Sequence, residues 1–167
     1  VNKDRHFPVK NLFDPVLYRK STDDLTDEQV TLIDDLQTRF KEYILSIEVE
    51  AKLVIDIATT QLYPAAINYI STLTSTASSL SGMGIELENS GTKNVVAEAN
   101  GMMAAVNKLS AALAEHDFDS TDEHMKYCAD VLCVLMVAVR SHADTLEGLV
   151  ADELWPLPKY QEMLFIK

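Results

Sequence analysis

Hydrophobic residues recur at helical spacing along most of this 167-residue chain. The first run opens at Thr26, where Thr26 and Gln29 match the pattern of a capping box and Leu25 can pack on Val30. Apolar positions then follow every three or four residues, as on one face of a helix, at Val30, Ile33, Leu36, Phe40, Ile44, Ile47, Leu53, Val54 and Ile57. The pattern predicts a long helix that begins near residue 26.

Pro64 is the first residue that disturbs this run. Proline removes a backbone donor and collides with the preceding turn of a helix, so it either kinks the helix or begins a new one. Apolar spacing continues through Ile67, Ile70 and Leu73, which favours one long helix kinked near Pro64. We expect Gly82 and Gly84 to end it, with the main loop over residues 83–94.

Two further helices follow from the same spacing. One is predicted from about Val95 to His116. The last opens at Ser120, which forms a capping box with Glu123, and is expected to continue to about Leu154.

The middle of the last helix, residues 131–139, is apolar on every side, which is typical of a central helix surrounded by neighbours. The helix must stop by Trp155, because the following Pro156 disfavours helical geometry at the residue before it.

These elements predict an all-α fold, an antiparallel helical bundle, with no competing strand pattern. Residues 1–25 read as an N-terminal connecting segment and residues 26–167 as the bundle domain, with an extended tail from residue 155. Burying a large aromatic side chain stabilises by roughly 1.5–3 kcal/mol, which offsets the ordering of a tail. We expect the tail to dock through Trp155, Pro156, Leu157, Leu164 and Phe165, and to expose Glu153, Lys159, Gln161 and Glu162.

Composition and charge exclude several classes of function. The net charge of −12 argues against nucleic acid and anionic membranes as partners. The longest apolar run, residues 131–139, is far shorter than the roughly 20 residues that span a bilayer. No signal peptide is recognisable at the start, and Cys128 and Cys133 lie on different faces of one predicted helix, so we expect a cytoplasmic protein without a disulfide.

The sequence evidence for a metal site is weak. Glu48, Glu50 and Asp56 raise the possibility of a di-iron bundle, but the chain has no Glu-x-x-His pair. His124 and Cys128 share one helix face and supply half of a zinc site, with no second pair to complete it. Phosphate loops and nucleophile elbows are also missing from the sequence. We expect no catalytic, cofactor-binding or metal residue in this chain.

Two stretches carry a resemblance to a known family. Residues 46–73, "SIEVEAKLVIDIATTQLYPAAINYISTL", and residues 149–165, "LVADELWPLPKYQEMLF", resemble the C-terminal helical region of type III glutamine synthetases. Residues 11–30 resemble the segment that precedes the long helix of that region more loosely, and residues 84–125 contribute only generic helix.

The resemblance implies a role in nitrogen metabolism. The family makes glutamine from glutamate and ammonia, using ATP and a divalent metal in a β-rich catalytic domain whose motifs are not found in this chain. It therefore implies a non-catalytic helical domain that contributes to subunit assembly or shapes the enzyme. Its implied partners are the catalytic region and the other subunits of a homo-oligomer.

Two alternatives remain open: a stand-alone helical interaction module, and an enzyme built on bundle carboxylates. A start at Val1 without an initiator Met favours an excised part of a larger ligase over a free-standing relative.

Overall fold

The computed structural model describes residues 26–115 and 117–158, and all regular structure in them is helical. The predicted all-α class is thereby confirmed. In chain order the elements are α2 (Asp27–Ile57), η3 (Ala58–Leu62), α3 (Tyr63–Gly82), α4 (Ser90–Leu113), α5 (Thr121–Tyr127), η4 (Cys128–Leu132), α6 (Cys133–Leu149) and η5 (Asp152–Leu154). Both η3 and η4 are single π-helical turns, and η5 is a short 3-10 helix.

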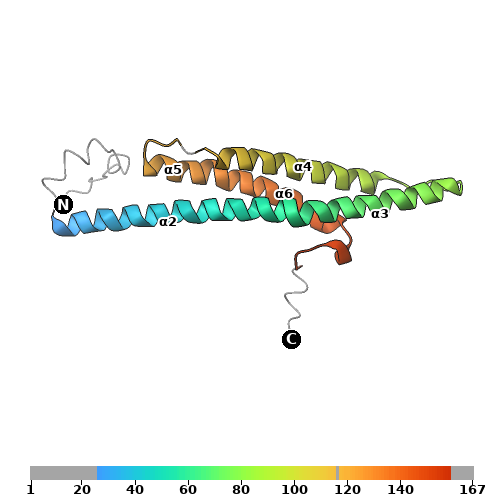
Figure 1. The fold of residues 1–167 in the computed structure, drawn as a ribbon, viewed down its shortest axis with the longest axis horizontal. Coiled ribbons are helices and arrows are strands. Elements are labelled where there is room, and N and C mark those ends of the chain that lie inside the picture. The colour runs from blue at the N-terminus through green and yellow to red at the C-terminus, as the bar shows by residue number, and fades with distance from the viewer. Residues whose placement is uncertain (1–25, 116, 159–167) are drawn as a thin grey trace, which may run out of the picture.

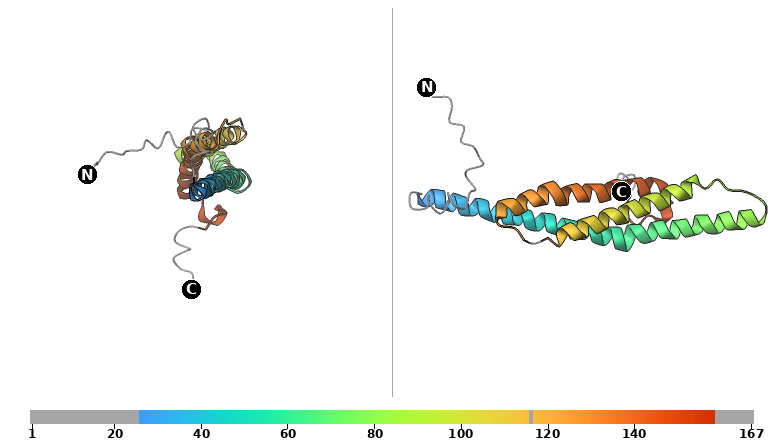
Figure 2. Two further views of the ribbon diagram at one scale, coloured as in Figure 1. Left: turned by 90° about the vertical axis from the view of Figure 1, so that its left-hand side faces the viewer. Right: turned by 90° about the horizontal axis from the view of Figure 1, so that it is seen from above.

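Within the described residues, the helices join into three long rods (Figure 1). The first is α2, η3 and α3 in one continuous run, and α4 returns antiparallel to it. The third rod, made of α5, η4 and α6, runs parallel to the first. Seen end-on, the rods form a triangle (Figure 2, left), so each rod packs on both others and keeps one side in solvent.

The first rod begins with the predicted capping box. The Gln29 amide donates to Thr26 Oγ1 at 3.3 Å, and the Thr26 amide donates to Gln29 Oε1 at 3.0 Å. These bonds satisfy two of the amides that a helix start leaves without a partner. The expected contact between Leu25 and Val30 lies outside the described residues.

The helix continues through Pro64, as predicted, and the irregularity lies just before it. In η3 the Tyr63 amide donates to the carbonyl of Ala58, five residues back. This wider turn makes room for the ring of Pro64, which lies in the first turn of α3 and has no amide to donate to the turn before it. The rod changes direction at this junction (Figure 2, right).

The first rod ends at Gly82, and Gly84 takes a φ of +77°, a left-handed conformation that favours glycine. The expected loop over residues 83–94 is too long, because α4 already begins at Ser90. Glu88 explains the early start: its carboxylate accepts from the Ser90 amide at 2.8 Å and from Ser90 Oγ. These hydrogen bonds hold the pKa of Glu88 below its usual value.

The cap of the third rod is close to the predicted one. Glu123 donates its amide to Ser120 Oγ at 3.2 Å, but its carboxylate accepts from the amide of Asp119, at 3.1 Å, and not from that of Ser120. The far end differs more, since α6 stops at Leu149 and not near Leu154. Val150 turns to an extended conformation there, and its amide donates to the carbonyl of Leu146.

The core runs along the common axis of the three rods. Its largest fully buried side chains are Met102, Leu109, Leu132, Leu146, Val95, Val139 and Cys128. The prediction that residues 131–139 form a surrounded central helix is wrong, because Val134 and Val137 are 60% and 66% exposed. With only two neighbouring rods, α6 covers one side and leaves the opposite side in water.

The tail packs back on the bundle as far as it is described. Trp155 and Leu157 are half-buried and contact the core cluster, while Pro156 and Glu153 are exposed. The other residues expected in the docked tail lie outside the described residues: Lys159, Gln161, Glu162, Leu164 and Phe165. None of the described helices is both long enough and apolar enough to cross a membrane.

Candidate functional site

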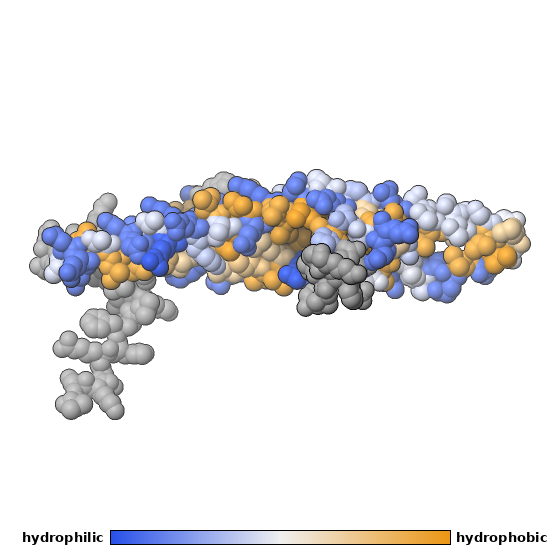
Figure 3. All heavy atoms as spheres, turned by 90° about the horizontal axis from the view of Figure 1, so that it is seen from below, coloured by the Kyte–Doolittle hydropathy of each residue, from blue (hydrophilic) through white to orange (hydrophobic). Residues whose placement is uncertain are grey.

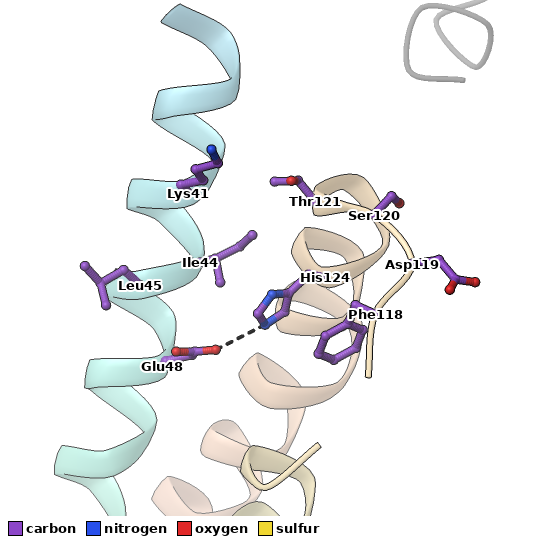
Figure 4. A pocket seen from close by; sticks show the side chains of 9 residues that line it. All are labelled: Lys41, Ile44, Leu45, Glu48, Phe118, Asp119, Ser120, Thr121 and His124. Carbon is purple, nitrogen blue, oxygen red and sulfur yellow. Dashed lines mark ion pairs between the residues drawn. The ribbon is translucent and has the colours of Figure 1, made fainter. Parts of the chain in front are cut away.

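A pocket of about 550 Å³ lies between α2 and the start of the third rod (Figure 4). One wall is α2, and the other is the link from α4 together with the first turn of α5. The lining residues are Lys41, Ile44, Leu45, Glu48, Phe118, Asp119, Ser120, Thr121 and His124. The mixture of one lysine, two hydroxyls, carboxylates and apolar side chains selects no single class of ligand.

An imidazole–carboxylate pair closes the inner end of the pocket. His124 Nε2 lies 3.1 Å from Glu48 Oε1, and both side chains are half-buried (Figure 4). The Phe118 ring stacks on the His124 ring, with centroids 4.2 Å apart and planes inclined by 12°. The imidazole is thereby fixed between α2 and the link, so the pair joins two rods.

Tyr127 adds a third ring to this stack. Its ring lies 5.0 Å from that of Phe118, and its hydroxyl donates to the carbonyl of Ala112 at 3.0 Å. Burial raises the pKa of Tyr127, which keeps the phenol protonated as a hydrogen-bond donor. The three aromatic rings tie the end of α4 to the start of the third rod.

The structure uses His124 differently from the half zinc site considered above. The imidazole is paired with Glu48, and Cys128 is fully buried in the core. Burial also raises the pKa of the Cys128 thiol, whereas a zinc ligand must be a thiolate. Nowhere in residues 26–115 and 117–158 do three His, Cys, Asp or Glu side chains gather as metal ligands.

A second imidazole–carboxylate pair joins the other two rods. His142 Nδ1 on α6 lies 2.7 Å from Glu98 Oε2 on α4. Gly101, one turn after Glu98, lies directly under the imidazole. Sequence reasoning found neither pair, because each depends on the register between two helices. The one local signal was Gly101, since a glycine inside a helix often marks a close approach.

Two outward faces carry exposed aliphatic side chains. On α2 these are Leu45, Val49 and Leu53, and on α6 they are Val134 and Val137. Figure 3, which views the molecule from below, shows hydrophobic surface near the middle of its long axis. Exposed aliphatic side chains that lie together mark a contact surface for another polypeptide more often than exposed side chains that are scattered singly.

Comparison with known proteins identifies relatives of one kind. The family described as glutamine synthetase C-terminal domain matches residues 14–81. A type-3 glutamine synthetase from Dictyostelium discoideum is 30% identical over 137 residues, which cover 77% of this chain and 19% of the relative. A glutamine synthetase from Bacteroides fragilis (strain YCH46) is 25% identical over 142 residues, or 79% of this chain and 19% of the relative.

No solved structure gives a significant match. The chain spans about a fifth of the length of each curated relative. The resemblance inferred from the sequence is thus confirmed, and the family model includes residues 46–73: this chain is similar to the C-terminal domain of glutamine synthetases and to a type-3 glutamine synthetase.

Proposed function

We propose that this chain acts as a non-catalytic helical domain of a type III glutamine synthetase-like ligase. The observation that carries the proposal is the match to the C-terminal domain of that family, in a chain that spans only 19% of its relatives' length. The catalytic region of such a ligase and its other subunits are the proposed partners. The role is assembly of subunits, or shaping of an enzyme that forms glutamine with ATP.

The geometry is consistent with a scaffold. The two imidazole–carboxylate pairs, Glu48–His124 and Glu98–His142, both join rods and thus fix the bundle. The outward face of α6 presents Val134 and Val137 to solvent, on a rigid helix whose opposite side is core. A rigid helix face with aliphatic side chains suits contact with another protein surface.

Binding to a catalytic region tests this proposal. The Bacteroides fragilis relative, with the segment that matches this chain removed, would serve as the binding partner. We expect it to retain the purified chain on a column, and the double variant V134D/V137D to reduce that retention. The matched control is Ile85→Asp, since Ile85 is also exposed but lies in the loop before α4. Failure of the unaltered chain to bind would contradict the proposal and favour a stand-alone interaction module.

The chain alone is predicted to have no glutamine synthetase activity and to bind neither ATP nor manganese tightly. Phosphoryl transfer needs cations and metal ions that stabilise the developing charge, and no catalytic motif of the resembled family occurs in this sequence. A biosynthetic assay should give turnover equal to that of a heat-killed sample. Turnover above that control would favour an enzyme built on bundle carboxylates.

A further inference from the structure

The outward side of α2 carries an aliphatic strip made of Leu45, Val49 and Leu53. The three side chains are 61%, 54% and 55% exposed, although the neighbouring Ile44, Ile47 and Ala51 are buried. Their spacing of four residues places them on one side of the helix. This aliphatic strip therefore runs along the rod as a continuous line, about 12 Å long from Leu45 to Leu53 at 1.5 Å per residue.

The described part of the tail leads toward the aliphatic strip. Trp155 and Leu157 pack on the core, and η5 lies against α3. From η5 the chain passes under the first rod toward its α2 half (Figures 1 and 2, left). Since α2 lies lowest in Figure 1, the described segment after η5 runs on the solvent side of the first rod.

The nine residues that follow, 159–167, have the length and composition to cover the aliphatic strip. In extended form they span about 30 Å, at roughly 3.3 Å per residue, which exceeds the length of the strip. Their apolar members are Tyr160, Met163, Leu164, Phe165 and Ile166. The segment carries two lysines, Lys159 and Lys167, and one glutamate, Glu162. The exposed side of α2 carries more carboxylates (Glu42, Glu50 and Asp56) than lysines near the strip (Lys52), so a weakly basic segment suits it.

We propose that residues 159–167 bind along the outward side of α2, over the aliphatic strip. The segment then completes the docking that Trp155 and Leu157 begin, and covers three aliphatic side chains that the described residues leave in water. The inference stands apart from the proposed ligase role, because it concerns contacts within this one chain.

A double-mutant cycle on the full chain tests this contact. Leu53→Ser is combined with the tail variant L164S/F165S, and the unfolding equilibrium constant is measured in urea for all four proteins. If the two sites touch, their effects on the unfolding equilibrium constant should not simply multiply. The constant of the combined variant should differ from the product of the separate effects by at least about threefold. The matched control is Leu32→Ser: Leu32 is an equally exposed leucine of α2, about 31 Å farther from the tail by helix rise, and should show no coupling.

Sedimentation of the same proteins shows whether a second copy of the chain covers the strip instead of the tail. We expect the association state to be the same with and without Leu53→Ser. Independent effects of the strip and tail variants would overturn the proposal. So would a dimer that Leu53→Ser dissociates, since the strip would then belong to a second copy of the chain.

Discussion

Gly101 sets how closely α4 approaches α6. A Cβ atom added there would lie 2.5 Å from Cε1 of His142, whose ring is held by Glu98. Gly148, also inside a helix, has open space at the same position. The two glycines therefore form a matched pair, in which only one is required by packing.

We predict that Gly101→Ala destabilises the protein and Gly148→Ala stabilises it. Alanine gains up to about 1 kcal/mol over glycine inside a helix. At Gly101 that gain is outweighed by overpacking, which typically costs about 1–3 kcal/mol, and by displacement of the imidazole from Glu98. Urea unfolding followed by circular dichroism gives both values. Equal changes in the two variants would show that His142 moves aside without cost.

The two cysteines are predicted to differ in reactivity. Cys128 is fully buried and burial raises the pKa of its thiol, whereas Cys133 is partly exposed. The thiolate is the reactive form, so iodoacetamide at pH 8 should modify Cys133 first and Cys128 only when the bundle opens. Mass spectrometry of timed samples measures both rates, and Cys133→Ser should leave one slow site. Equal rates would mean that the core around Cys128 opens readily.

Among the elements, helix starts were predicted better than helix ends. Thr26 and Ser120 signal a start through side-chain bonds within three residues, which a sequence displays directly. The start of α4 was missed because its bonds come from Glu88, ahead of a stretch of weak helix formers. The end of α6 was missed because the apolar spacing continues into Val150, which is buried in an extended conformation.

Pro64→Ala is predicted to keep the helix content and lower the melting temperature. Alanine restores an amide and is a better helix former by about 3 kcal/mol in a straight helix interior. The new amide favours ordinary four-residue bonds over the π turn that places Ala58 and Leu62 in the core. A straightened rod would rotate α3 against α4 and loosen that packing. A variant that melts above the parent would show that the bend contributes little to the core.

For the whole molecule, the sequence predicted the class of fold and the order of the helices. Contacts between rods could not be predicted from the sequence, because the apolar spacing of a helix indicates which side is buried but not its register against a neighbouring helix. His124 illustrates this limit: its spacing from Cys128 suggested a metal site, whereas its partner is Glu48, far away in sequence. The number of rods was equally hidden from the sequence: residues 131–139 are apolar all round, yet Val134 and Val137 lie at the surface because α6 has only two neighbouring rods.

The first rod extends well past the start of the third at its N-terminal end (Figure 1). No residue of α2 before Ile44 is buried, and only Ile33, Leu36 and Phe40 are partly buried there, so this end is less well packed than the rest of the helix. Most of the stability of a helix in a protein comes from tertiary packing of its apolar face and not from helix propensity. Amide hydrogen exchange should therefore show a gradient along one continuous helix, fast over residues 30–40 and slow over residues 47–62. Uniform protection would mean that this end is covered. With the predicted gradient, the first turns of α2 would become fully ordered only on contact with a neighbouring surface. Such a contact could then be detected as slower amide exchange at the N-terminal end of α2 alone.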